Sequence, residues 1–120
     1  MILNLAHQKL DIYSYSKKLV FECYKISKLL PSEEKFGMIS QIRRAALSVH
    51  LNIAEGASRR SELERKRYYE IARGSLVEID AALDIAVGLN YLNDKNLSIL
   101  KEALLICFKL LTGLLKSIQH

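Results

Sequence analysis

Residues 41–56 read Gln-Ile-Arg-Arg-Ala-Ala-Leu-Ser-Val-His-Leu-Asn-Ile-Ala-Glu-Gly, and this stretch decides the fold. Apolar side chains recur here at alternating intervals of three and four, which places them in one stripe along an α-helix. That stripe consists of Ile39, Ile42, Ala46, Val49 and Ile53. A second stripe, about 100° round the helix, is small and polar and consists of Gln41, Ala45, Ser48, Asn52 and Glu55. Because small side chains let another backbone approach, we expect the helix to be covered on two sides, by its own bundle and by something else.

Composition bounds the class of protein. The 120 residues are 50% apolar and 26% charged, which suits one soluble domain over residues 1–120. No uncharged run reaches the roughly 18 residues that span a bilayer, and the first residues lack the features of a secretory signal. We therefore expect a cytoplasmic protein without membrane contact. Cys23 and Cys107 have no metal-ligand spacing, so we interpret them as buried free thiols and expect neither a metal nor a cofactor.

Helix signals divide the first part of the chain. We expect one helix from about Lys9 to Leu30, ended by Pro31, because the residue before a proline is disfavoured in the helical region. A second helix is expected to begin with Ser32 as its N-cap and to end near Gly56, which suits a left-handed conformation. The inner face of the first helix is predicted to consist of Ile12, Tyr15, Leu19, Cys23, Ile26 and Leu30.

The second half predicts two more helices. Ser61 and Glu64 form a capping-box pattern that opens a helix over about residues 62–89, and Asp94 can cap a last helix. Gly74 in mid-helix predicts close approach of another backbone. The third helix is expected to bury Tyr68, Ile71, Ala82, Ile85 and Leu89, widened by Ala72, Leu76, Ile79 and Leu83. Short connections make neighbouring helices antiparallel, so the fold class is all-α, an antiparallel up-down-up-down four-helix bundle.

Four polar side chains lie in or beside these apolar seams, namely Asn52, Glu55, Ser75 and Glu78. Two carboxylates on adjacent helices can in principle do acid–base chemistry. No nucleophile, metal spacing or phosphate loop accompanies them in the sequence, so we do not expect an enzyme. We favour a buried structural polar network in which the carboxylates pair with Arg43 or Arg73 and fix the register of helices or subunits.

Positive charge is concentrated in the middle of the chain. All seven arginines lie between residues 43 and 73, and the net charge is +5. A nucleic-acid surface, a solvated face and a set of intersubunit salt bridges are all compatible with this cluster. The candidate nucleic-acid-binding residues are Arg43, Arg44, Arg59, Arg60, Arg65, Lys66 and Arg67. Lysines of the first helix, Lys17, Lys18, Lys25 and Lys28, are interpreted as a solvated face.

Three sequence blocks resemble a known family: residues 41–46 (Gln-Ile-Arg-Arg-Ala-Ala), residues 52–56 (Asn-Ile-Ala-Glu-Gly) and residues 74–78 (Gly-Ser-Leu-Val-Glu). The chain resembles the bacterial four-helix-bundle family whose founding members are encoded in intervening sequences of 23S ribosomal RNA genes. Accessory variability proteins of diversity-generating retroelements also belong to that family. The matching signature side chains are Arg43, Arg44, Asn52, Glu55, Arg59, Ser75 and Glu78. The sequence departs from the family pattern at His50 and Leu51, where a proline is frequent, so we expect an unkinked second helix.

The resemblance implies a four-helix bundle that assembles into a ring-like homopentamer. For the retroelement relatives it also implies a positively charged surface that binds nucleic acid and a partner reverse transcriptase. We therefore expect a non-enzymatic homo-oligomer that binds RNA or DNA with weak sequence specificity and serves as an adaptor to a partner enzyme. The alternative is a structural or protein-interaction oligomer whose arginines form intersubunit salt bridges.

Overall fold

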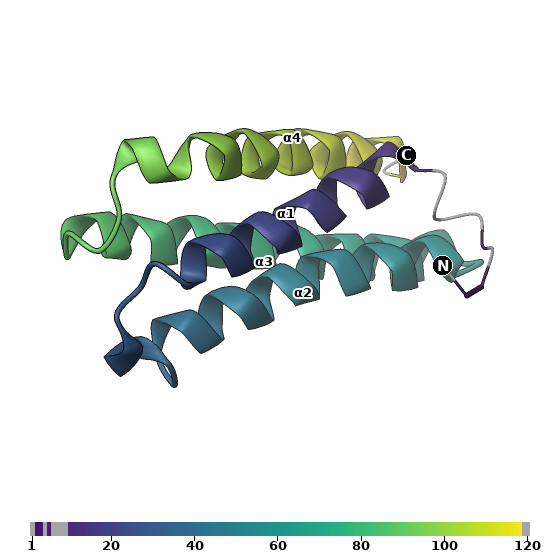
Figure 1. Ribbon diagram of the computed structural model, residues 1–120. Helices are drawn as coiled ribbons and strands as arrows, with labels where there is room; N and C mark the ends of the chain where they lie inside the picture. Colours follow the sequence, from purple (N-terminus) through teal and green to yellow (C-terminus); the bar gives the residue numbers. More distant parts are fainter. Residues whose placement is uncertain (1, 4, 6–9, 119–120) are drawn as a thin grey trace.

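The computed structural model describes residues 2–3, 5 and 10–118 and is drawn in Figure 1. Its helices are α1 (Asp11–Ser27), the short 3-10 helix η2 (Ser32–Glu34), α2 (Met38–Ser58), α3 (Glu62–Gly88) and α4 (Asp94–Ile118). The described residues contain no strand. α1 and α3 each pack against α2 and α4, and the two diagonal pairs do not meet within the described chain. The predicted all-α four-helix bundle is confirmed.

The core follows the stripe that opens the sequence. Ile42, Val49 and Ile53 of α2 are fully buried. They share one core with apolar side chains from the other three helices, of which the most deeply buried are Leu19, Cys23, Ala72, Ile79, Ala86, Leu100, Cys107 and Leu111. Burial of both thiols is confirmed, and loss of hydration raises the pKa of Cys23 and of Cys107 to about 12. Within the described residues, none of the helices is both long enough and apolar enough to cross a bilayer.

The first helix differs from its predicted extent and inner face. α1 ends at Ser27, one turn before Pro31, and the predicted start at Lys9 lies outside the described residues. Tyr15 is 38% exposed, so its predicted place in the inner face is wrong. Ser16 is fully buried there instead, because its hydroxyl lies 2.7 Å from Nδ1 of His50 and donates to the Tyr13 carbonyl at 3.0 Å. Ser16 lies four residues after Ile12 and three before Leu19, so its spacing alone predicts a place in the inner face of this helix.

The start of α2 is also corrected. Ser32 does not cap it; residues 32–34 form η2, and α2 begins at Met38 after Gly37. The carboxylate of Glu34 accepts a hydrogen bond from the Met38 amide at 3.2 Å, and so supplies the acceptor that the N-terminus of α2 needs. α2 then runs through His50 and Leu51 as one helix, as the missing proline predicts.

Gly56 does not end α2 in a left-handed conformation, and no described glycine has a positive φ. It lies inside the last turns of α2, where an added Cβ would be 2.8 Å from Cε1 of Tyr69 in α3. Glycine is therefore needed for close packing of α2 on α3. Around Gly74, by contrast, no atom lies within 4 Å of an added Cβ, so the predicted close approach is absent from the described protomer.

α3 begins as predicted, with Ser61 Oγ accepting from the Glu64 amide at 3.3 Å. The buried face of α3 consists of the residues that were expected only to widen the apolar stripe, Ala72, Leu76, Ile79 and Leu83, together with Tyr69 and Ala86. Ile71, Ile85 and Leu89 are about half exposed, at 46%, 56% and 51%, so their predicted burial is wrong. Two apolar rows competed in the sequence, and the buried one includes the small Ala72 and Ala86, which let α3 lie close to its neighbours.

α4 is capped by a different residue from the predicted one. Asp94 is the first residue of the helix, and its carboxylate pairs with Lys101 at 2.7 Å. Asn93 and Asn96 cap the helix reciprocally, because each side-chain oxygen accepts from the other residue's amide, at 2.9 and 3.0 Å. The pairing with Lys101 lowers the pKa of Asp94.

Candidate nucleic-acid interface

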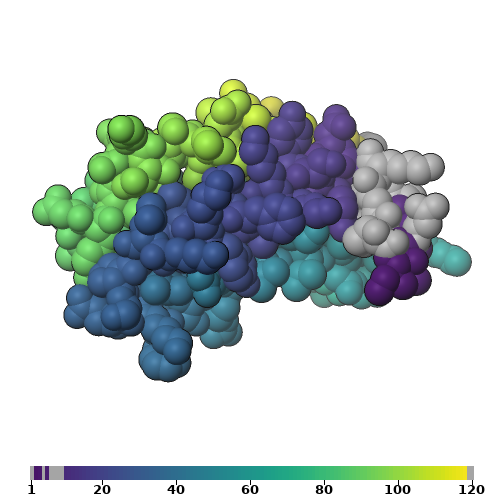
Figure 2. All heavy atoms as spheres, in the orientation of Figure 1, coloured from purple at the N-terminus to yellow at the C-terminus, as the bar shows by residue number. Residues whose placement is uncertain are grey.

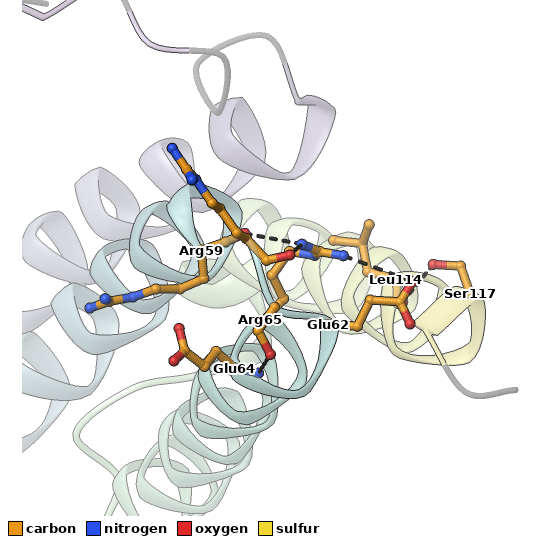
Figure 3. Close-up of polar contacts among 8 residues, drawn as sticks. Arg59, Glu62, Glu64, Arg65, Leu114 and Ser117 are labelled. Atoms are coloured by element: carbon orange, nitrogen blue, oxygen red, sulfur yellow. Dashed lines mark hydrogen bonds and ion pairs between the residues drawn. The ribbon is translucent and has the colours of Figure 1, made fainter.

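The basic residues after α2 surround the turn that leads into α3. α2 ends at Ser58, Arg59 is extended (φ −83°, ψ 143°), and Ser61 caps α3. Figure 3 shows Arg65 reaching back from the first turn of α3. Its Nη1 donates to the carbonyl oxygens of Arg59 and Arg60 at 3.0 and 2.7 Å. Arg65 therefore holds the turn in place, and we call residues 59–67 the basic corner.

Arg59 is also engaged within the protomer. Its Nη2 lies 3.0 Å from Oε2 of Glu55 and donates to the Tyr68 hydroxyl at 3.1 Å. The guanidinium carbon lies 5.1 Å from the centre of the Tyr68 ring, a cation–π distance. Tyr68 first, and then Glu55, raise the pKa of Arg59. Glu55 is thus a surface partner of Arg59, and within the described protomer it pairs with neither Arg43 nor Arg73.

The other cations of the basic corner form no such ion pairs among the described residues. Arg60 and Arg67 are exposed and Lys66 is half-buried. Within residues 10–118, none of the three forms an ion pair with a described carboxylate. Lys66 and Arg67 line a shallow hollow of about 470 Å³ on α3, together with Leu63, Glu70 and Ile71. These three side chains are free to contact a polyanion.

Carboxylates partly balance this corner. Residues 55–71 contain five basic and four acidic side chains. Two of the four, Glu55 and Glu62, lie 3.0 and 4.0 Å from Arg59 and Arg65 respectively. The other two, Glu64 and Glu70, are exposed and form no ion pair among the described residues. The net charge of this segment, five basic minus four acidic side chains, is therefore only +1.

Arg43 and Arg44 lie elsewhere. They precede Arg59 by about 16 residues of continuous helix, or roughly 24 Å at 1.5 Å per residue. Nε of Arg43 donates to Ser27 Oγ of α1 at 2.8 Å, and its guanidinium carbon lies 4.8 Å from the Tyr24 ring centre. Arg44 is exposed. The seven candidate residues therefore do not form one patch, because Arg43 and Arg44 lie far along α2 from the basic corner and Arg43 is bound to α1.

Only part of the predicted polar network comes together. Nδ2 of Asn52 donates to the Ser48 carbonyl and lies 3.1 Å from Ser48 Oγ, which accepts from Ser75 Oγ at 2.9 Å. Ser75 is buried and joins α3 to α2 through this chain. Glu55 and Glu78 are exposed and Arg73 is half-buried, and none of them joins this chain among the described residues. The linking residue, Ser48, belongs to the small polar stripe of the opening stretch.

Two further sets of polar contacts were not predicted from the sequence: Ser16 with His50, and Arg43 with Tyr24 and Ser27. Both join α1 to α2 in the half of α2 before Asn52. A pairing between distant residues leaves no local sequence signal. Among the described residues, no group of three or more His, Cys, Asp or Glu side chains is placed to hold a metal ion.

Comparison with known proteins identifies the chain. No curated protein matches it. The family model described as "23S rRNA-intervening sequence protein" matches residues 8–113, which include α1, α2, α3 and the first 20 residues of α4. Because this match covers most of the chain, the protein belongs to the 23S rRNA-intervening sequence protein family.

Proposed function

We propose that this protein is a non-enzymatic homo-oligomer that binds RNA or DNA through exposed arginine and lysine side chains, with weak sequence specificity. The observation that carries the proposal is that Arg44, Arg60, Lys66 and Arg67 are left without a described carboxylate partner in the protomer. Long, exposed cations bind phosphates at any base sequence, so affinity without strong specificity follows.

A structural role for the polar residues supports the non-enzymatic part of the proposal. Asn52 and Ser75 bond to Ser48, whereas Glu55 holds Arg59 at the surface. The two candidate carboxylates, Glu55 and Glu78, are both exposed, and Glu55 is already engaged by Arg59.

Assembly would amplify the charge. Each chain carries a net charge of +5, so a ring of five copies would carry about +25 and would attract a polyanion strongly at low salt. The family description names an intervening sequence of 23S rRNA, which is compatible with a nucleic-acid partner. Within the proposal, the assembly acts as an adaptor that presents RNA to a partner enzyme such as a reverse transcriptase.

The test compares two triple variants of equal charge. One replaces Arg60, Lys66 and Arg67 with Gln; its control replaces Lys95, Lys109 and Lys116 of α4 with Gln. We expect the first to weaken binding of a labelled RNA and to reduce the salt slope, log Kd against log salt, by about 2 to 3, since each phosphate contact contributes roughly 0.7 to 0.9. Equal losses in the two variants would show that the corner has no special role.

A second candidate function is supported by the outer face of α3 and α4. Val77, Leu105 and Phe108 are 55%, 56% and 41% exposed and line a groove of about 490 Å³ between the two helices. An exposed apolar patch of this kind is typical of a protein interface. A purely structural oligomer would use this face and would need no nucleic acid. It predicts that Val77→Lys dissociates the assembly, and that the wild-type protein binds no RNA or DNA at low salt.

A further inference from the structure

The outward face of α1 carries an exposed aromatic side chain among four lysines. Phe21 is 62% exposed. The lysines lie at i−4, i−3, i+4 and i+7 from it, which places all four on its side of the helix: Lys17, Lys18, Lys25 and Lys28. α1 crosses the face of the molecule shown in Figure 2, between α2 and α4. A phenylalanine this exposed contributes little to the stability of the core. The lysines around it favour a negatively charged ligand.

A groove runs beside Phe21, between α1 and α2. Its volume is about 430 Å³, and it is lined by Val20, Phe21, Tyr24, Lys25, Lys28 and Leu47. Tyr24 is held in place, because the Arg43 guanidinium lies 4.8 Å from its ring centre and is itself fixed by the hydrogen bond to Ser27. The groove therefore presents two aromatic rings, one of them preorganised, with ammonium groups beside them.

The excess of basic over acidic side chains is larger in α1 and α2 than in residues 55–71, around the basic corner. Residues 11–30 and 38–58, which include both helices in full, contain six basic and three acidic side chains, the latter being Asp11, Glu22 and Glu55. Glu22 lies 3.8 Å from Lys25 and its side chain is only 14% exposed, and Glu55 is bound to Arg59. Among the described residues, Lys17, Lys18 and Lys28 pair with no carboxylate. These two segments therefore carry a larger excess of positive charge, six basic against three acidic side chains, than residues 55–71, with five against four.

We propose that the groove between α1 and α2 binds single-stranded nucleic acid, with a base stacked on Phe21 and the flanking phosphates held by Lys17, Lys25 and Lys28. This inference rests on the proposed function and names the form of nucleic acid that the protein prefers. In a duplex each base is stacked between its neighbours. An exposed aromatic ring on a helix can therefore stack only on an unpaired base, or on a duplex base after the costly unstacking of two neighbouring bases. Aromatic rings among cations are the combination that sequence-tolerant single-strand binders use.

The test measures fluorescence anisotropy of labelled 12-nucleotide uridine RNA, thymidine DNA and a 12-base-pair duplex. Phe21→Ala is expected to weaken binding of both single strands by about 5- to 150-fold, the loss of one stacked base. Duplex affinity is expected to change little, and Phe21→Trp is expected to restore single-strand binding. The control is Phe36→Ala, since Phe36 is 91% exposed beside Lys35 but does not line the groove.

The outcomes separate this inference from the proposed function. If the wild type binds nucleic acid and loses affinity in the corner variant, but Phe21→Ala binds single strands normally, the groove is refuted and the proposed function stands. If the wild type binds neither single strands nor duplex at low salt, both fall. If Phe21→Ala instead lowers the mass of the assembly in light scattering, the face is a contact between copies and the inference is overturned.

Discussion

Two identical glycine substitutions test how closely α2 packs on α3. Gly74→Ala adds a methyl group where nothing lies within 4 Å, so it gains the helix propensity of alanine, about 1 kcal/mol. In Gly56→Ala the new Cβ would lie 2.8 Å from Tyr69 Cε1 and 3.1 Å from Tyr68 Cβ. Tyr69 is only 4% exposed and cannot swing into solvent, so overpacking costs about 1 to 3 kcal/mol.

The difference between the two variants is the quantity to measure, because the gain in helix propensity is largely common to both. We expect Gly56→Ala to have a free energy of unfolding about 1 to 3 kcal/mol lower than Gly74→Ala. Urea titration followed by circular dichroism, at one protein concentration, gives both values. Equal stabilities would refute the close contact at Gly56. A Gly74→Ala variant that dissociates into smaller species would instead place Gly74 against another copy.

Three further results are expected from the same structure. Arg65→Ala removes both hydrogen bonds to the turn carbonyls, and so speeds amide exchange in residues 59–61 while the helices stay protected; unchanged exchange would refute that role. Ser16→Ala lowers the free energy of unfolding by about 1 to 2 kcal/mol, whereas the exposed Ser14→Ala changes it little, as urea titration would measure. Because burial raises the thiol pKa of Cys23 and Cys107 from 9.0 to about 12, the unfolded chain releases these protons first. The free energy of unfolding therefore falls as pH rises from 9 to 12, less steeply in a variant with both cysteines replaced by Ala.

Local signals in the sequence predict the bundle well. The three-four repeats of α2 and α4, the capping residues Ser61 and Glu64, and the short connections were sufficient for four antiparallel helices. These local signals do not predict which of its two apolar rows α3 buries. Ile71 and Ile85 are as apolar as Ile79, and only the space left by α2 and α4 selects between them.

The candidate site was harder to predict, because sequence spacing does not show which cations are already engaged. Arg59 and Arg65 look like Arg60 and Arg67 in the sequence, yet the first two are bound to Glu55 and to turn carbonyls. Such contacts depend on how the turn is folded. The lysines of α1 were interpreted as a solvated face, and the exposure of Phe21 among them becomes visible only when α1 is docked on its neighbours.

The most direct test of the central claim is a titration of labelled RNA with the wild-type protein at about 50 mM and about 200 mM salt. We expect binding at the lower salt concentration and a loss of affinity of at least about tenfold at the higher one, because counterions are released when phosphates are bound. No binding at the lower salt concentration would contradict the account, as would an affinity that does not change with salt.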